Sequence, residues 1–433
     1  MDTVTRQLSN LTASTLCLKS KIRHRLVNIK DGIAGRKATR AHEVTHESWH
    51  PWQELKRLQV QENVPKELVP KPTWEPGIEA GYRPPYKPWR YYFFSLVQWH
   101  NETVNVWTHL IGSVLIVLYM LHFHDTMDYL NNPRAWPHLM LGVCSLICTS
   151  ASGVCHLIHS KSAFAHYVTF SFDYAGAGIY GLGLGTCILF YTCDKDMVYY
   201  FGRLFLPILV VCCATMCFCI CYGKVKYSLH HHHRRKMWFV ISTVPPYACM
   251  FLMGFPRYVR CYFLNPNPDP VDVQSWHLHR YHLITFFAAT FFFVSHVPEI
   301  YAYGEFDMLG QGHQLWHVFL VCTMVFQLYA THYDYTTNGE RSPDVLANLP
   351  GYETCLYVVG ILILTDLFLI VCASRIARQV VDEEHHELPR CAGSDTVDHQ
   401  RRREKRSYLE ASTSPRVLRK STILQRRVVI RKL

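Results

Sequence analysis

The sequence predicts an all-α, polytopic membrane protein: a helical bundle with a seven-span core and an eighth span near the C-terminus. Two observations support this fold class. The mean hydropathy of the 433-residue chain is near zero, yet long apolar blocks lie between two polar ends. A helix needs about 20 mostly apolar residues to cross a bilayer. Eight stretches approach this length, at roughly residues 105–124, 137–158, 167–192, 198–222, 237–254, 281–297, 314–333 and 354–373.

The first region of the chain, residues 1–80, is polar and mixed in charge, and we expect a flexible cytoplasmic arm there. The stretch PYKPWRYYFFSLVQWH, residues 85–100, instead mixes basic and aromatic side chains. Amphipathic rings and basic groups favour the lipid headgroup layer. We therefore expect an interfacial helix that leads into a bundle covering residues 81–374.

One predicted span is interrupted by proline. Pro245 and Pro246 lie in the middle of the fifth apolar stretch. Proline within a spanning helix is tolerated when neighbouring helices satisfy the freed carbonyl groups. We expect a kinked helix there, and we keep the segment as a span.

The orientation of the bundle depends on basic residues near the membrane. The two sets of connecting loops carry six Lys and Arg residues each, so they do not decide it. Lys87 and Arg90 precede the first span, and Arg375 and Arg378 follow the eighth, on the same side. The positive-inside rule then places both termini in the cytoplasm. We expect an integral protein of the plasma membrane.

The C-terminal region, residues 375–433, is expected to be a basic, disordered cytoplasmic tail. It holds 15 Lys and Arg against 8 Asp and Glu, which is most of the chain's net charge of +11. Such a tail is either a solvated topogenic signal or a contact for anionic lipid. A tethered tail without a fold does not favour nucleic-acid binding.

Polar side chains gather at one depth of the predicted bundle. Ser152 and His156 lie near the end of span two, Asp173 lies near the start of span three, and His313 and His317 open span seven. Because alternate spans run in opposite directions, these positions fall on the same membrane side. Three further polar residues join them: Asn105, His109 and His296. Ionisable groups inside a membrane usually mark a functional site.

These residue types fit a zinc site. His313 and His317 are four residues apart, so they share one helix face, and His156 supplies a third imidazole from a neighbouring helix. Three histidines with one open position are the ligand set of a catalytic Zn²⁺. We expect Ser152 to hydrogen-bond a metal-bound water or the ligand. Asp173 is expected to orient an imidazole or a water.

Other interpretations of these patterns remain open. Two histidines at this spacing also occur where a helix is capped or meets water, and only the common depth of several polar groups favours a metal. The run HHHH at 230–233 is followed by RRK, which is typical of a solvated basic loop. Three cysteines on the predicted outer side could form a disulfide: Cys193, Cys261 and Cys355.

Several motifs together resemble the progestin and adipoQ receptor family. They are NETVNVWTH at 101–109, SGVCH at 152–156, FDYAG at 172–176 and VPEIYAYGEFDMLGQGHQLWH at 297–317, preceded by the basic aromatic segment from Tyr82. The resemblance covers roughly residues 78–375. The basic aromatic segment and the eighth span resemble the membrane progestin receptor branch more than the seven-span adiponectin receptors.

The resemblance implies a bundle with a cytoplasmic N-terminus and a zinc ion near the cytoplasmic side. Histidines matching His156, His313 and His317 hold the zinc in this family, and positions matching Ser152 and Asp173 accompany it. Trp316 departs from the family, whose members commonly carry a smaller aromatic residue there.

Two functions of different classes follow from these expectations. In the first, the protein is a receptor: a steroid or another lipid-like ligand enters the bundle and shifts a conformational equilibrium that a cytoplasmic partner, such as a G protein, detects. In the second, it is a zinc-dependent amidohydrolase that cleaves a ceramide-like sphingolipid, with Asp173 moving the proton. Both functions need the same ligands, and the branch resemblance favours the receptor.

Overall fold

The structure is a computed structural model, and it describes residues 63–227, 232–337, 345 and 347–387. The described residues all belong to one compact unit of the chain, which begins at Val60. Within the described ranges the fold is helical, and its β-structure is limited to an isolated bridge between Val64 and Tyr82. The all-α fold class predicted from the sequence is confirmed.

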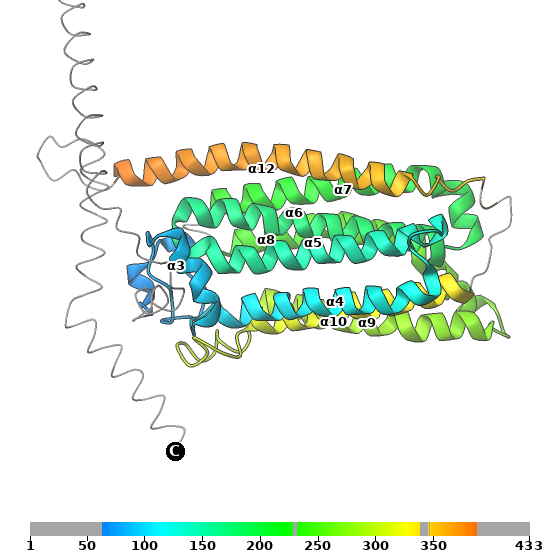
Figure 1. Ribbon diagram of the computed structural model, residues 1–433, viewed down its shortest axis with the longest axis horizontal. Coiled ribbons are helices and arrows are strands. Elements are labelled where there is room, and N and C mark those ends of the chain that lie inside the picture. The colour runs from blue at the N-terminus through cyan, green and yellow to red at the C-terminus, as the bar shows by residue number, and fades with distance from the viewer. Residues whose placement is uncertain (1–62, 228–231, 338–344, 346, 388–433) are drawn as a thin grey trace, which may run out of the picture. The chain divides into compact units, whose positions relative to one another are not determined.

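Long helices lie side by side and make up the bundle (Figure 1). They are α4 (Thr103–Met127), α5 (Trp136–Ile158), α6 (Ala163–Cys187), α7 (Lys195–Tyr227), α8 (His232–Val259), α9 (Pro270–Ser295), α10 (Gly312–Thr337) and α12 (Thr354–Glu387). Among the described residues, seven of these helices are long and apolar enough to cross a membrane, all except α9. α9 has the length, but its first half carries His277, His279, Arg280 and His282. α8 continues through Pro245 and Pro246 as one helix.

α6 is the central helix of the bundle. It packs against α5, α7 and α12, and 89% of its most apolar stretch is buried, against 28% for α4 and α12. Its sequence is rich in glycine, which lets backbones approach closely. At Gly183 an added Cβ would lie 2.9 Å from Cβ of Cys144 and 3.2 Å from Cα of Leu141 on α5. The α5–α6 contact therefore depends on the missing side chain.

One end of the bundle is covered by the segment that precedes α4 (Figure 1, blue). This segment contains two 3₁₀ turns, η1 (Lys66–Leu68) and η2 (Lys71–Thr73), and a small core of Val64, Val69, Ile78 and Tyr82. The α9–α10 loop meets it, since the backbone N–H of Gly304 donates to the carbonyl of Gly77. Residues 63–80, which polarity alone assigned to a flexible arm, thus form part of the folded segment.

The aromatic stretch before the first span forms the short helix α3 (Trp89–Phe94) and the turn η3 (Ser95–Val97). Tyr91 and Tyr92 are buried, whereas Trp89, Phe93 and Trp99 are about half exposed. Exposed aromatic rings beside basic groups are typical of a membrane interface. The expected helix is present, and its position at the membrane interface stays a prediction.

Two further expectations differ from the structure. α12 continues to Glu387, beyond the boundary at 374, because the residues after the apolar stretch (ARQVVDEEHHE) lack glycine and proline and sustain a helix although they are polar. No disulfide joins the three outer cysteines Cys193, Cys261 and Cys355 to one another in the described part of the chain, so the pairing suggested for them is absent there. The tail motifs beyond residue 387 and the side chains of the HHHH run lie outside the described residues.

Candidate metal centre

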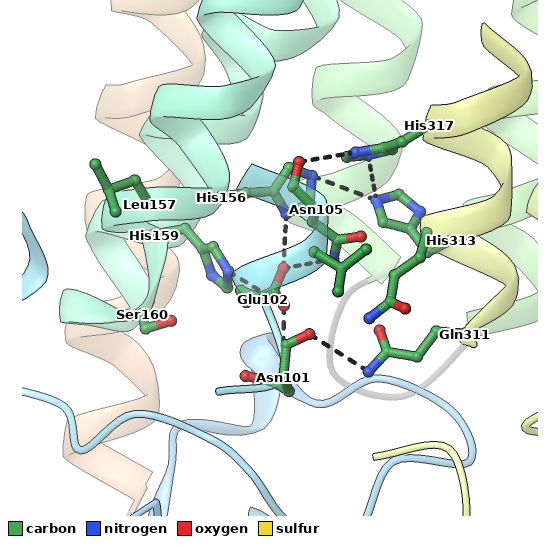
Figure 2. A network of polar contacts seen from close by, with 12 residues as sticks. Asn101, Glu102, Asn105, His156, Leu157, His159, Ser160, Gln311, His313 and His317 are labelled. Atoms are coloured by element: carbon green, nitrogen blue, oxygen red, sulfur yellow. Dashed lines mark hydrogen bonds and ion pairs between the residues drawn. The ribbon is translucent and has the colours of Figure 1, made fainter. Parts of the chain in front are cut away.

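Three histidines from two helices converge at the end of the bundle that α3 covers (Figure 2). His156 lies in the last turn of α5, and His313 and His317 lie in the first two turns of α10. Nε2 of His313 is 3.3 Å from Nε2 of His156 and 3.2 Å from Nε2 of His317. All three side chains are largely buried. The structure therefore brings together the three residues that the sequence analysis selected as metal ligands.

The hydrogen bonds on the other ring nitrogens fix which atoms face the centre. Nδ1 of His156 is 2.8 Å from Oε2 of Glu102, and Nδ1 of His317 is 3.2 Å from the backbone oxygen of Asn105. Both partners accept hydrogen bonds, so both Nδ1 atoms carry the proton and each Nε2 presents a lone pair. Nε2 of His313 can donate a hydrogen bond to Nε2 of His156 or to Nε2 of His317, but not to both. A bound cation would satisfy all three lone pairs at once.

The distances between the histidine nitrogens also fit a zinc ion. In tetrahedral coordination at the usual Zn–N length, two ligand nitrogens lie about 3.3 Å apart. The distances of 3.2 and 3.3 Å match this value. Three imidazole nitrogens that converge in this way are the donor set of a zinc site with one open position.

Glu102 is a functional candidate that the sequence analysis missed. It lies just before α4, is 4% exposed, and its Oε2 accepts hydrogen bonds from His156 and from Asn105 Nδ2, the latter at 2.7 Å. Burial alone would raise the pKa of Glu102, but hydrogen bonds from His156 and His159 hold it well below the usual range. The carboxylate therefore orients His156, as acidic partners of metal-binding histidines do. The available signal in the sequence was that Glu102 lies three residues before Asn105 and seven before His109, which places all three on one face of a helix.

A buried arginine holds the end of α5. Arg83 is 1% exposed, and its guanidinium donates to the backbone oxygens of His156 and Leu157, at 2.7 and 2.5 Å, and to the hydroxyls of Ser95 and Ser160. These carbonyls end a helix and have no partner within it, so a cation there is favourable. Arg83 thereby connects the N-terminal segment to the backbone of His156.

The two predicted catalytic residues lie beside the histidines. Ser152 is one turn before His156 on α5, and Asp173 is on α6; both are buried. The Asp173 carboxyl group acts electrostatically on His156 and Lys224, and the Ser152 hydroxyl has no hydrogen-bond partner among the described residues. Neither residue belongs to the groups whose atoms could hold a metal among the described residues. They are therefore neighbours of the histidine cluster and not members of its donor set.

Further polar and aromatic groups enclose the histidine cluster. The ring of His109 lies 3.9 Å from that of His317, and neither of its nitrogens has a hydrogen-bond partner among the described residues. The ring of Trp316 lies 4.9 Å from that of His313. Buried nitrogens without partners are costly unless water or a ligand satisfies them. The surroundings thus have unused capacity for polar contacts.

A cavity of about 70 Å³ adjoins the centre. The residues that line it are Glu75, Pro76, Ile78, Glu102, Asn105, His156, Phe170, Tyr174, Ile220, Lys224, Arg235, Lys236, Phe239, Phe293, His296, Glu299, Gln311 and His313. A water molecule needs roughly 10 to 15 Å³ of such space. The cavity therefore has room for several waters or for the polar end of a ligand.

Comparison with known proteins gives one family. A family model described as haemolysin-III related matches residues 97–328. Membrane progestin receptor alpha-B of Danio rerio is 33% identical over 290 residues, which is 67% of this chain and 81% of that protein. Membrane progestin receptor beta of Mus musculus is 34% identical over 68% of this chain and 82% of its own length. Membrane progestin receptor alpha of Homo sapiens is 31% identical, over 74% and 90%.

Proposed function

The chain belongs to the haemolysin-III-related family, in which the progestin and adipoQ receptors fall, and from this membership we propose that it binds a steroid or another lipid-like ligand within its bundle. The family recognised from the sequence motifs is confirmed, and the chain is an integral membrane protein of receptor type. The observation that carries the proposal is the similarity to several membrane progestin receptors, which extends over most of the bundle.

The ligand is proposed to approach the cavity beside the histidines. The cavity has an aromatic wall of Phe170, Tyr174, Phe239 and Phe293, which suits a flat apolar molecule. Pockets that enclose a whole ligand of drug size measure about 300 to 1,000 Å³, so the bundle must open for a steroid to enter. A ligand that prefers the open arrangement would shift this equilibrium. We propose that a cytoplasmic partner, with a G protein as a candidate, detects the shift.

Zinc is the proposed resident ion, held by His156, His313 and His317. In such a site Zn²⁺ acts as a Lewis acid and activates water. Glu102 fixes the ring of His156, Asn105 fixes that of His317, and Arg83 fixes the end of α5. The histidine end of the bundle is proposed to face the cytoplasm, together with both termini, in the plasma membrane.

Binding of progesterone tests the receptor function. Full-length protein in detergent should bind radiolabelled progesterone saturably, and unlabelled progesterone should displace it. Phe239→Ala, in the aromatic wall, should weaken binding at least fivefold. Phe287→Ala on α9 changes a side chain that is 66% exposed, so it should bind as the wild type does. Absence of saturable binding would remove steroids from the proposal.

Zinc content tests the ligand assignment separately. Purified protein should contain about one zinc per chain, and His317→Ala should lose it. His122→Ala, an exposed histidine on α4, should keep it. An unchanged zinc content in His317→Ala would refute the assignment.

Hydrolysis of a ceramide-like amide is the second candidate function. It is favoured by the cavity, which borders His156 and His313 and has room for water, and by the buried Asp173 carboxyl group, which acts electrostatically on His156. Asp173 is proposed to take a proton from the attacking water and to pass it to the leaving amine. Ser152 is proposed to hydrogen-bond the substrate carbonyl.

Release of fatty acid from labelled ceramide distinguishes the two functions. An amidohydrolase should release it, and Asp173→Asn should slow the release about 100-fold or more. Asp125→Asn, an exposed position on α4, should not change the rate. If zinc-loaded protein binds progesterone but releases no fatty acid, the hydrolase function is excluded and the receptor function remains.

A further inference from the structure

The cavity beside the histidine cluster has a cationic wall that the metal centre does not explain. Lys224 lies near the end of α7, and Arg235 and Lys236 lie near the start of α8. α7 and α8 pack against each other, so the three basic side chains reach the cavity from the same end of a helix pair. The other walls contain aromatic side chains, the histidines and three glutamates.

Lys224 is buried without a matched counterion. It is 4% exposed, and its Nζ lies 4.1 Å from the ring centroid of Phe170. Among the described residues, no carboxylate lies within ion-pair distance of this ammonium; Glu75 and Asp173 act on it only from farther away. A buried charge costs several kcal/mol unless it is paired and hydrogen-bonded. Such a residue in a membrane protein is a candidate for ligand binding.

Arg235 adds a second unused donor to this wall. Its Nη1 atom is buried and has no hydrogen-bond partner within the described ranges. Arg235 and Lys224 also act on each other as like charges. Lys236 donates to the backbone oxygen of Val294 at 2.6 Å, which leaves it two further N–H groups. An anion between these groups would satisfy the donors and remove the repulsion.

None of the glutamates that line the cavity forms an ion pair with these basic side chains in the described part of the chain. Glu102 already accepts from His156 and Asn105, and Glu299 accepts from the backbone N–H of Gly312 at 2.7 Å. Glu75, in the N-terminal segment, acts on both Lys224 and Lys236 without forming an ion pair with either in the described part of the chain. The negative charge of Glu75 therefore weakens the attraction of these lysines for an incoming anion.

We propose that Lys224, Arg235 and Lys236 bind a terminal oxyanion, a sulfate or a phosphate, on a lipid whose apolar part lies against the aromatic wall. Arginine and lysine are the usual partners of such groups. The cavity of about 70 Å³ is far below the size of a pocket for a whole lipid and suits a polar end group. The inference rests on the proposed lipid-binding function and specifies the ligand class.

Matched pairs of lipids test the inference on full-length protein in detergent. The pairs are pregnenolone sulfate with pregnenolone, and lysophosphatidate with monoacylglycerol; each differs by the oxyanion. In at least one pair, the anionic lipid should bind at least tenfold more tightly than its neutral partner. The pair that shows the preference identifies the ligand as a steroid or an acyl lipid.

Variants assign the preference to the basic wall. Lys224→Met and Arg235→Met should each reduce it below threefold, whereas Arg234→Met, at an exposed neighbouring position, should keep it. Lys224→Arg, which retains the charge, should keep most of it and shows that a loss in Lys224→Met is not a folding defect. Glu75→Gln should strengthen binding of the anionic lipid about two- to fivefold.

Three results would overturn the inference: equal affinity within both pairs, an unchanged preference in Lys224→Met and Arg235→Met, or displacement of the lipid by inorganic phosphate at the same concentration. The last result would mean that the wall takes free phosphate. Progesterone binding is measured on the same samples. If progesterone fails to bind while the acyl pair keeps the oxyanion preference, only the steroid part of the proposed function is lost.

Discussion

At the scale of single residues, Glu102 shows how a buried charge orients one of the three converging histidines. Its carboxylate holds His156 in the tautomer that presents Nε2 to the centre. Glu102→Gln keeps the size of the side chain but removes the charge. Partners of this kind contribute about 10- to 100-fold to metal affinity, so we expect zinc affinity to fall by that factor in competition with a chelator. Glu383→Gln, an exposed position on α12, should match the wild type; equal affinity in both variants would exclude the role.

Asp307 gives a prediction for pH. It lies in the α9–α10 loop and accepts a hydrogen bond of 2.7 Å from the backbone N–H of Glu79. Burial raises the pKa of its carboxyl group to about 6, against about 3.9 in an unfolded chain. The folded state thus holds this proton more tightly. The stability from Asp307 is complete below a pH of about 4 and is lost as the pH rises through about 6.

The measurement compares the wild type with Asp307→Asn, which does not titrate. From about pH 4 to pH 7 the thermal midpoint of the wild type should fall relative to that of the variant. Asp125→Asn serves as the control and should follow the wild type throughout. A difference that stays constant, or that moves in the opposite direction, would contradict the assignment.

Part of the candidate site could be predicted from the sequence because its histidines lie at one depth in the predicted bundle. His156, His313 and His317 were identified because helix spacing and the alternation of spans place them on one face and at one level. Glu102 and Arg83 were missed because their roles depend on contacts between α4, α5 and the N-terminal segment. No periodicity in the sequence encodes which helices are neighbours.

At the scale of helices, the approach of α5 to α6 depends on glycine. A Cβ at Gly183 would lie within 3.2 Å of Cα of Leu141, an atom that can move only with its helix. Gly183→Ala should therefore destabilise the fold by about 1 to 3 kcal/mol, the usual cost of overpacking. Gly181→Ala is the matched control on the same helix, because its Cβ would meet only Sγ of Cys213 at 3.8 Å. It should be neutral or gain up to about 1 kcal/mol from helix propensity.

Thermal midpoints in detergent, followed by tryptophan fluorescence, measure this difference. Equal midpoints for the two alanine variants would show that α5 moves away at little cost. The zinc content of Gly183→Ala should remain that of the wild type if the effect is confined to packing, because His156 lies several turns from this contact.

The helices themselves were predictable because hydropathy records burial in lipid. The ends of helices were not, because polarity and helix formation are separate properties. α12 continues past the last apolar residues as a polar helix, and the N-terminal segment folds through local contacts such as the bridge between Val64 and Tyr82. α9 combines a polar, histidine-rich first half with an apolar second half, which a window average cannot resolve.

At the scale of the whole molecule, the polar chemistry is concentrated where distant segments meet. The candidate metal centre joins the start of α10 to the end of α5, and the cavity beside it adds α7, α8 and the N-terminal segment. An event in the cavity therefore acts on segments far apart in sequence. This is the arrangement expected of a receptor in which ligand binding must alter one end of a bundle.

The last prediction concerns metal removal. An ion held by both α5 and α10 binds the folded state and not the unfolded chain, so it stabilises by RT ln(1 + [Zn]/Kd), about 2.7 kcal/mol when free zinc is 100 times the Kd. A strong chelator should therefore lower the thermal midpoint of the wild type, and added zinc should restore it. His317→Ala should begin at the lower midpoint and respond to neither treatment, whereas His122→Ala should respond as the wild type does. If the chelator removes zinc without lowering the wild-type midpoint, the ion does not join the two helices, and the convergence of the three imidazoles must be maintained by Glu102, Asn105 and Arg83 alone.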